Sequence, residues 1–265
     1  MPVALEHIRR MRGGAQAQLM RCDDGHYYVV KFQNNPQHPR ILVNELLGTR
    51  MAAQLGIPTP PAEVIHVSEE LIRYSEELAI EVGRTRTPCQ PGPQFGSRYP
   101  GQPERVVVHD FLPDKELDEL ENLHDFAGAL VFDKWICNTN GRQSIFHRPR
   151  EQARYRAAFL DQGFACNAGE WTFPDAPLRG IYMRQRVYAG VRGMESFAPW
   201  LHRLETHITA ALCDQVLTEI PPEWYGFEQG PLLGLLEKLM RRRKLVPELI
   251  LAAKNSSRQP FPNWS

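Results

Sequence analysis

The sequence predicts an α+β fold of two lobes, a β-rich first lobe that contains one helix and a second lobe that is mainly helical. Short runs of β-branched and aromatic residues dominate the first hundred residues, whereas apolar residues recur at three- and four-residue steps after about residue 115. Strand-rich and helix-rich sequence are therefore separated along the chain rather than alternating. The change falls near residues 109–114, so we expect the lobes to be residues 1–110 and 111–265.

The composition is that of an ordinary globular protein. The 265 residues include 31 Lys and Arg against 31 Asp and Glu, so the chain lacks the basic excess of a dedicated nucleic-acid-binding surface. Neither an apolar run long enough for a membrane helix nor the apolar segment of a signal peptide is evident, which predicts a cytoplasmic protein that does not contact membranes. Five widely spaced cysteines without a C-x-x-C pair predict neither a disulfide framework nor a zinc site.

The first lobe is expected to contain strands around one helix. The chain turns at Gly13-Gly14, and a β-rich run at 27–32 follows a second turn, which predicts a strand–turn–strand unit. The periodic apolar residues of 39–55, followed by a Gly-x-Pro stop, predict a helix. Residues 62–67 and 78–82 are expected to be further strands.

Half of the residues from Pro88 to Pro103 are Gly or Pro. This content predicts a long, exposed and mobile loop without regular structure, which trypsin should cleave first near Arg98. A short buried strand is expected at 106–108, and helical periodicity then runs over 117–131 and 201–216.

Lys31 and Glu45 are the first candidate site residues. Two-residue alternation places Lys31 on the strand face that carries Tyr27 and Val29, and a buried ammonium there needs a counterion. Glu45 lies on a helix face of small and apolar neighbours, one connection away. Protein kinases use such a strand Lys and helix Glu to hold ATP phosphates. From this pair alone, a structural ion pair remains an alternative.

Three further segments are compatible with the same chemistry. The small-residue turn at 12–18 is suited to backbone contacts with phosphate, although an ordinary hairpin turn is the alternative. Asp133 and Asn138 have the D-x-x-x-x-N spacing of a kinase catalytic loop. Asp161 follows an apolar strand-like pair and begins an Asp-Gln-Gly sequence, the arrangement by which a kinase aspartate reaches Mg²⁺, although an ordinary Asp-x-Gly turn is the alternative.

In this order, the segments resemble the HipA-like kinase domain over about residues 7–220. The matching segments are Gly14-Ala15-Gln16, Val30-Lys31-Phe32, Val43-Asn44-Glu45, Asp133-Lys134-Trp135, Asn138 to Gln143, Asp161-Gln162-Gly163, Trp171 to Asp175 and Pro177 to Gly180. The resemblance implies a bacterial cytoplasmic protein with a two-lobed, protein-kinase-like fold that binds ATP and Mg²⁺ and phosphorylates Ser or Thr hydroxyls of proteins.

By position, the resemblance makes Gly14, Ala15 and Gln16 a phosphate-covering loop, Lys31 the phosphate lysine, Glu45 its partner and Asp161 the metal ligand. The catalytic loop departs from the family pattern.

The resemblance implies an Asp at the position of Asn140 and a metal-binding Asn at the position of Ile145, whereas this sequence has Asn and Ile there. Two registers therefore remain open. Either Asn140 occupies the base position, or Asp133 is the base and Asn138 a metal ligand.

These residues predict an ATP- and Mg²⁺-dependent phosphotransferase that acts on a hydroxyl, with Ser or Thr of a protein as one candidate acceptor. A nucleotide-binding pseudokinase that acts as an interaction module is the alternative. A small-molecule kinase is a further alternative, although such enzymes have a histidine-rich catalytic loop and no His occurs between His124 and His147.

Overall fold

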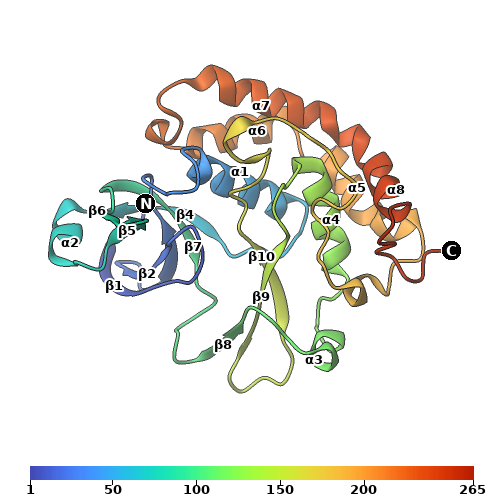
Figure 1. Ribbon diagram of the computed structural model, residues 1–265, viewed down its shortest axis with the longest axis horizontal. Coiled ribbons are helices and arrows are strands. Elements are labelled where there is room, and N and C mark those ends of the chain that lie inside the picture. Colours follow the sequence, from blue (N-terminus) through green and yellow to red (C-terminus); the bar gives the residue numbers. More distant parts are fainter.

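A computed structural model describes all residues, 1–265 (Figure 1). The strands are β1 (Ala4–Arg10), β2 (Gln18–Cys22), β3 (Tyr27–Lys31), β4 (Ala62–Val67), β5 (Ala79–Val82), β6 (Thr85–Pro88), β7 (Gly92–Arg98), β8 (Val106–His109), β9 (Gln143–Pro149) and β10 (Arg156–Leu160). The α-helices are α1 (Ile41–Gln54), α2 (Glu69–Tyr74), α3 (Asp114–Asp118), α4 (Asp125–Ile136), α5 (Ala198–Thr206), α6 (Ala210–Glu219), α7 (Gln229–Arg242) and α8 (Val246–Lys254). Short 3₁₀ turns lie at Ala168–Glu170, Gln185–Tyr188, Met194–Phe197, Pro222–Tyr225 and Arg243–Leu245.

A five-stranded antiparallel sheet with the order β1-β2-β3-β7-β4 occupies the N-terminal end of the molecule (Figure 1). The predicted helix at 39–55 and the strands at 27–32 and 62–67 are confirmed to within two residues. Helix α2 was not predicted from the sequence. Its N-cap is Ser68, whose hydroxyl accepts a hydrogen bond from Leu71 N, a capping signal too short to stand out in the apolar pattern.

The predicted loop at 88–103 is wrong, because β7 lies inside the sheet between β3 and β4. Gly96 is required there, since a Cβ at this position would lie 2.3 Å from Ile65 Cγ1. Strand β3 pairs with residues 95–98 of β7. Pro93 lies outside this range, so its missing N–H removes no hydrogen bond between β3 and β7. Arg98 ends this strand, so early cleavage by trypsin at Arg98 is no longer expected.

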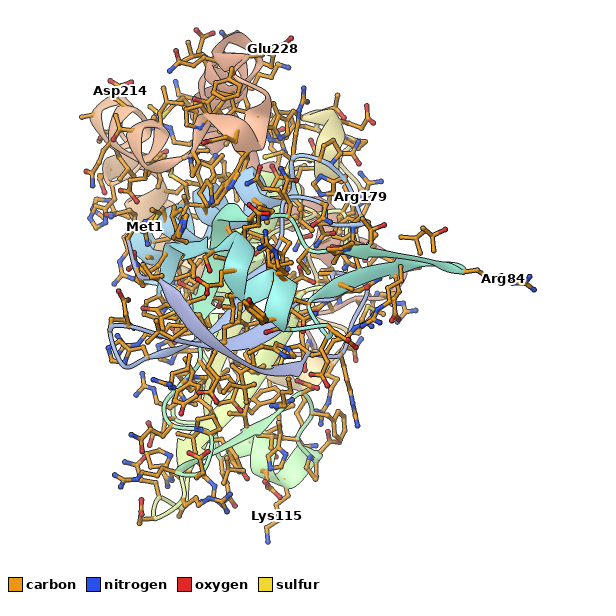
Figure 2. All side chains as sticks on the ribbon, turned by 90° about the vertical axis from the view of Figure 1, so that its left-hand side faces the viewer. Met1, Arg84, Lys115, Arg179, Asp214 and Glu228 are labelled. Atoms are coloured by element: carbon orange, nitrogen blue, oxygen red, sulfur yellow. The ribbon has the colours of Figure 1, made fainter.

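Two smaller sheets complete the strands. A three-stranded sheet with the order β10-β9-β8 lies between the large sheet and the helices (Figure 1). The predicted strand at 106–108 is present in it, but its residues are half-buried rather than buried. The β5–β6 hairpin pairs only with itself, and Figure 2 shows Arg84 at its tip, projecting from the body of the molecule.

The second half of the chain is mainly helical. The predicted helix over 117–131 is two helices, α3 and α4, and the pattern over 201–216 is likewise divided into α5 and α6. Thr209 causes the second division, because its hydroxyl caps α6 by accepting a hydrogen bond from Leu212 N. All residues of α4 are buried, so this helix is the centre of the helical part.

Two hydrophobic clusters hold the fold together. The larger one contains 49 buried residues and joins α1 to α4 and the C-terminal helices, so α1 packs against these helices as well as against β4 and β7 of its own sheet. The smaller one, of 12 buried residues, lies between the five-stranded sheet, α2 and the β5–β6 hairpin. None of the helices is both long enough and apolar enough to span a membrane.

Candidate functional site

Three segments that are distant in sequence meet at Lys31, Glu45 and Asp161. Lys31 is the last residue of β3, Glu45 lies in the second turn of α1, and Asp161 directly follows β10. Lys31 Nζ donates to Glu45 Oε1 and to Asp161 Oδ1, the latter at 2.9 Å. The predicted partners are therefore in contact, and the structure adds Asp161 to the same cluster.

The cluster is buried and holds one ammonium group between two carboxyl groups. Lys31 is 9% exposed and Glu45 is 2% exposed. Burial alone would lower the pKa of Lys31, but the carboxylates of Glu45 and Asp161 outweigh it and raise the pKa, so the ammonium stays charged. Burial likewise opposes ionisation of Asp161, and Lys31 nevertheless holds the pKa of that carboxyl below its ordinary value. The charged forms of Lys31 and Asp161 thus stabilise each other.

Glu45 also holds the backbone of the Asp-Gln-Gly segment. Its carboxylate accepts hydrogen bonds from Gln162 N at 3.0 Å and from Gly163 N at 2.9 Å. Gly163 allows this close approach, because a Cβ there would lie 2.7 Å from Ile41 Cγ1 and 3.1 Å from Glu45 Oε1. The carboxylate of Glu45 therefore fixes both the lysine and the segment that carries Asp161.

Asn44, next to Glu45 on α1, was part of the matched sequence but was not predicted to have a role of its own. Its side-chain nitrogen lies 2.9 Å from each of three carbonyl oxygens, those of Gly163, Ala165 and Ala168. Its oxygen accepts a hydrogen bond from Trp171 Nε1.

These contacts surround residues 166–168, three consecutive non-glycine residues with positive φ angles between 55° and 61°. Such a backbone persists only where neighbouring groups fix it. Asn44 therefore positions the turn that follows the Asp-Gln-Gly segment.

The Gly14-Ala15-Gln16 turn lies between β1 and β2. The backbone N–H groups of Gly14 and Ala15 donate to no protein group, which leaves them available to an anion. Gln16 has φ of +51° and its side chain exchanges two hydrogen bonds with the backbone of Glu81, at 2.6 Å and 2.8 Å. The β5–β6 hairpin therefore holds the turn in place.

The loop before α1 connects this turn to the Asp-Gln-Gly segment. A Cβ on Gly14 would lie 3.5 Å from Gln37 Nε2, and the ring of His38, the next residue, contacts Gly163 O through Nε2 at 2.8 Å. His38 Nδ1 is buried without a hydrogen-bond partner. Burial lowers the pKa of His38, so the ring is kept neutral.

Asp133 and Asn138 form no hydrogen bond with Lys31, Glu45 or Asp161. Asp133 is on α4, fully buried, and forms a two-bond contact with the guanidinium of Arg142, with Nε to Oδ2 at 2.8 Å. Asn138 donates to Asp133 Oδ1 at 3.0 Å, and its own oxygen accepts a hydrogen bond from Asn140 N. This packing does not fit the register in which Asp133 is a base and Asn138 a metal ligand, because the polar atoms of both side chains are already engaged.

The Asp133–Arg142 pair instead ties α4 to the Asp-Gln-Gly segment. Arg142 donates to Leu160 O at 2.9 Å and to Gln162 Oε1 at 3.1 Å, on either side of Asp161. Burial alone would lower the pKa of Arg142, and Asp133 raises it, so the guanidinium remains charged. This link, which sequence reasoning missed, positions the metal-binding candidate from the helical side.

Asn140 is exposed and lies in a turn. Its side-chain oxygen accepts a hydrogen bond from the next residue, Gly141 N, at 2.9 Å, and it forms no hydrogen bond with Lys31 or Asp161. Ile145, at the other departure from the family pattern, is half-buried in β9. The catalytic-loop position therefore presents a neutral amide to solvent.

A divalent cation at this site would depend on bound phosphate. No group of three or more His, Cys, Asp or Glu side chains is arranged to hold a metal ion. Asp161 offers a carboxylate, and Mg²⁺ bound with a nucleotide requires only one or two carboxylates in addition to phosphate oxygens and water. The residues present fit Mg²⁺ that is held between Asp161 and phosphate, with no second protein ligand among the predicted ones.

The segment after Asp-Gln-Gly is held by buried cations. Lys134 Nζ donates to Pro177 O at 2.7 Å and to Ala176 O at 3.2 Å, and burial lowers its pKa to about 8. Arg242, from α7, pairs with Asp175 at 2.7 Å. The segment is thus fixed against α4 and α7 rather than free in solvent.

Solved structures share this architecture at low sequence identity. The Helicobacter pylori proinflammatory kinase CtkA matches with a TM-score of 0.57 and 12% identity, over 94% of both chains. The Golgi casein kinase matches with a TM-score of 0.52 and 12% identity, over 96% of this chain and 74% of that one. The structure of the Golgi casein kinase with Mn and ADP bound matches with a TM-score of 0.51 and 11% identity, over 97% of this chain and 73% of that one. The fold is therefore protein-kinase-like.

Sequence comparison is more specific. No curated protein matches the sequence. The profile described as HipA-like kinase matches residues 5–146, more than half of the chain, and this range includes the phosphate-loop candidates, Lys31, Glu45 and the catalytic-loop position. The resemblance inferred from the motifs is thereby confirmed, and the chain belongs to the HipA-like kinase family.

Proposed function

We propose that the protein is an ATP- and Mg²⁺-dependent phosphotransferase with a hydroxyl acceptor and a low turnover rate. The observation that carries this proposal is the buried Lys31–Glu45–Asp161 cluster, in which the lysine is charged and aligned by two carboxylates from separate elements. Phosphoryl transfer depends mainly on positioning and charge neutralisation, which such a cluster supplies. The structure of the Golgi casein kinase with Mn and ADP bound supports the use of a nucleotide and a divalent cation by this fold.

Each residue then has a defined task. Lys31 contacts the phosphates, Glu45 orients Lys31, and Asp161 holds Mg²⁺ together with phosphate oxygens. The free N–H groups of Gly14 and Ala15 bind phosphate, while Gln16 fixes their turn. Mg²⁺ supplies charge neutralisation on the transferred group. We also propose that residues 1–110 and 111–265 act as two lobes.

The low turnover rate follows from the residue at the position of the catalytic base. A neutral amide such as Asn140 cannot accept the proton of the acceptor hydroxyl, and general-base catalysis typically contributes about 10²- to 10⁴-fold. Asp133 does not replace it, because Arg142 and Asn138 occupy its carboxylate. Positioning and electrostatic stabilisation remain, so transfer is slowed rather than abolished.

A nucleotide-binding pseudokinase is the second candidate. It is favoured by the engaged amide of Asn138 and by Ile145, since together they leave Asp161 as the single predicted metal ligand. Under this alternative, the site binds nucleotide without turnover and the protein acts through interactions.

Labelled ATP separates the two candidates. The wild type should show slow autophosphorylation or ATP hydrolysis, and Asn140→Asp should raise that rate at least tenfold while ATP affinity stays nearly unchanged. Binding without turnover in both proteins would favour the pseudokinase. The absence of ATP binding would contradict both candidates.

The acceptor is proposed to be a hydroxyl of a protein. The Golgi casein kinase, whose name gives a protein substrate, shares the fold. In addition, Lys134 and Arg242 fix the segment between Asp161 and Arg179 against α4 and α7, and we propose that an extended chain binds along it. Transfer of label to a denatured-protein mixture, compared with aminoglycosides and sugars, tests this choice.

A further inference from the structure

A small groove lies between the chain that follows the Asp-Gln-Gly segment and the C-terminal tail. Residues between Leu178 and Gln185 line one side of it, and Arg258 and Pro260 line the other. We call it the tail groove. Its volume is about 210 Å³, below the usual range of small-molecule sites, which begins at about 300 Å³. This size suits one large side chain of another chain rather than a nucleotide.

The walls of the tail groove are fixed. Gln185 Nε2 donates to Arg258 O at 2.8 Å and to Gln259 O at 3.2 Å. Gln259 has a φ of +41°, a backbone conformation that persists only where neighbouring groups hold it. Phe261, further along the tail, is 5% exposed and packs against Tyr188, with ring centroids 5.5 Å apart. The tail is therefore anchored to the body of the protein, and the groove is preformed.

Apolar side chains that line the tail groove remain exposed to solvent. Met183 is 60% exposed and Leu178 is 40% exposed, whereas Ile181, between them in the sequence, is buried. Single exposed apolar residues are ordinary on a protein surface, but apolar residues grouped around a concave site are typical of a contact with another molecule. The tail groove is therefore a candidate docking site.

The charge at the tail groove favours an acidic partner. Arg258 is the one charged residue in the lining. It is exposed, and its guanidinium forms no hydrogen bond or ion pair within the protein. Two acidic residues of the neighbouring α3, Asp114 and Asp118, do not compensate it, because they are paired with Arg184 and Arg186. The groove thus combines an apolar cleft with one unpaired cation.

The tail groove continues the segment along which the acceptor chain is proposed to bind. Gly180 packs tightly on α4, since a Cβ there would lie 2.3 Å from Asp133 Cβ. Asp133 pairs with Arg142, whose guanidinium also donates to Gln162 Oε1 at 3.1 Å. Direct contacts therefore connect this side of the groove to the Asp-Gln-Gly segment. None of the proposed nucleotide-binding residues lines the groove.

We propose that the tail groove docks the acceptor protein through one apolar side chain, a Leu or Phe flanked by Asp or Glu. The proposal rests on the proposed function, in which the acceptor is a hydroxyl of a protein. A few anchor side chains in preformed pockets supply most of the binding energy of a protein contact. Arg258 adds charge complementarity, which selects acidic over basic neighbours of the anchor. The groove then contributes to the choice of acceptor.

Fluorescence anisotropy with three labelled peptide pools of equal length tests the docking. The first pool has a Leu or Phe between Glu residues and Ala or Ser elsewhere, the second has Lys in place of Glu, and the third has Ser in place of Leu or Phe. Only the first pool should bind. Met183→Asp should weaken its binding about tenfold or more, because an apolar contact is lost. Arg258→Glu should weaken it about fivefold.

Two exposed residues outside the tail groove provide matched controls. Leu251→Asp changes an apolar side chain on α8 that is 42% exposed, and Lys244→Glu reverses an exposed charge. Both variants should bind the first pool as the wild type does. Mg²⁺ with a non-hydrolysable ATP analogue should not displace the pool, because the nucleotide site lies outside the groove.

The docking proposal is overturned if the first pool does not bind, if the three pools bind equally, or if Met183→Asp and Arg258→Glu both bind as the wild type does. Self-association of the wild type that Met183→Asp abolishes would also overturn it, because a second copy would then cover the groove. An excess of the first pool should lower label transfer from ATP to the denatured-protein mixture, and unchanged transfer would show that the groove does not select the acceptor. Failure of the wild type to bind Mg-ATP contradicts the proposed function instead, and the anisotropy measurements still decide whether the groove binds apolar and acidic segments.

Discussion

Replacement of Asp133 by Asn tests whether this residue holds the fold or performs chemistry. In Asp133→Asn the guanidinium of Arg142 loses its counterion while its side chain stays 1% exposed. Removal of one partner of a buried ion pair typically costs about 3 to 5 kcal/mol, because the other charge is left uncompensated. The hydrogen bond that Asn138 donates to Asp133 is also weakened. We therefore expect a large loss of stability.

Urea and thermal unfolding measure this loss. A cost of about 3 to 5 kcal/mol corresponds to a fall in Tm of roughly 6 to 20 °C for a chain of this size. Asp118→Asn is the matched control, because Asp118 forms an exposed pair with Arg186 and its loss should barely move the midpoint. Arg142→Gln should also destabilise the protein. The double variant of Asp133→Asn and Arg142→Gln should lose less unfolding free energy than the sum of the two single variants, because neither buried charge is then left without its partner.

The opposite pattern would refute this reasoning. If Asp133→Asn were as stable as the wild type and yet abolished an appreciable phosphotransfer rate, Asp133 would be the base. The register of the catalytic loop would then have to be reassigned.

Two further perturbations address the sheet and the loop before α1. Gly96→Ala should destabilise the protein by about 1 to 3 kcal/mol, because its Cβ would overlap Ile65. The control Gly234→Ala, at an open position inside α7, should stabilise the protein slightly. Equal urea midpoints for the two variants would contradict the placement of β7. His38 has a lowered pKa in the folded protein, so below about pH 6.5 the unfolded chain binds the proton more readily and stability falls as the pH decreases. His38→Gln should flatten the stability profile between pH 7 and 5, and an unchanged slope would show that His38 is not buried as a neutral ring.

The parts of the site that depend on local pattern could be predicted from the sequence. Strand alternation placed Lys31 on the apolar face of Tyr27 and Val29, and helix periodicity placed Glu45 on a face of small and apolar neighbours, so their contact follows from two short segments. Asp161 was named as a candidate because its motif combines an apolar strand with a flexible glycine, and the structure brings it into contact with Lys31. In each case, the information lies within a few residues of the side chain.

The remaining features depend on contacts that no local pattern reveals. The strand β7 was predicted as a loop because glycine and proline disfavour strands in general, whereas this position requires Gly96 for the close approach of Ile65. Asn44 matters because its amide meets three carbonyl groups about 120 residues away. Asp133 has a kinase-like spacing to Asn138, but its role depends on Arg142, which reaches it across the intervening turn.

The most direct test of the central claim is the affinity for Mg-ATP of the wild type and of Lys31→Ala, measured by calorimetry. Loss of the lysine removes a charge-assisted phosphate contact worth about 1.5 to 3 kcal/mol, so binding should weaken roughly 10- to 150-fold. Lys115→Ala, which changes an exposed lysine on α3, should bind as the wild type does. Equal affinity of wild type and Lys31→Ala would contradict the assignment of the Lys31–Glu45–Asp161 cluster as the nucleotide site.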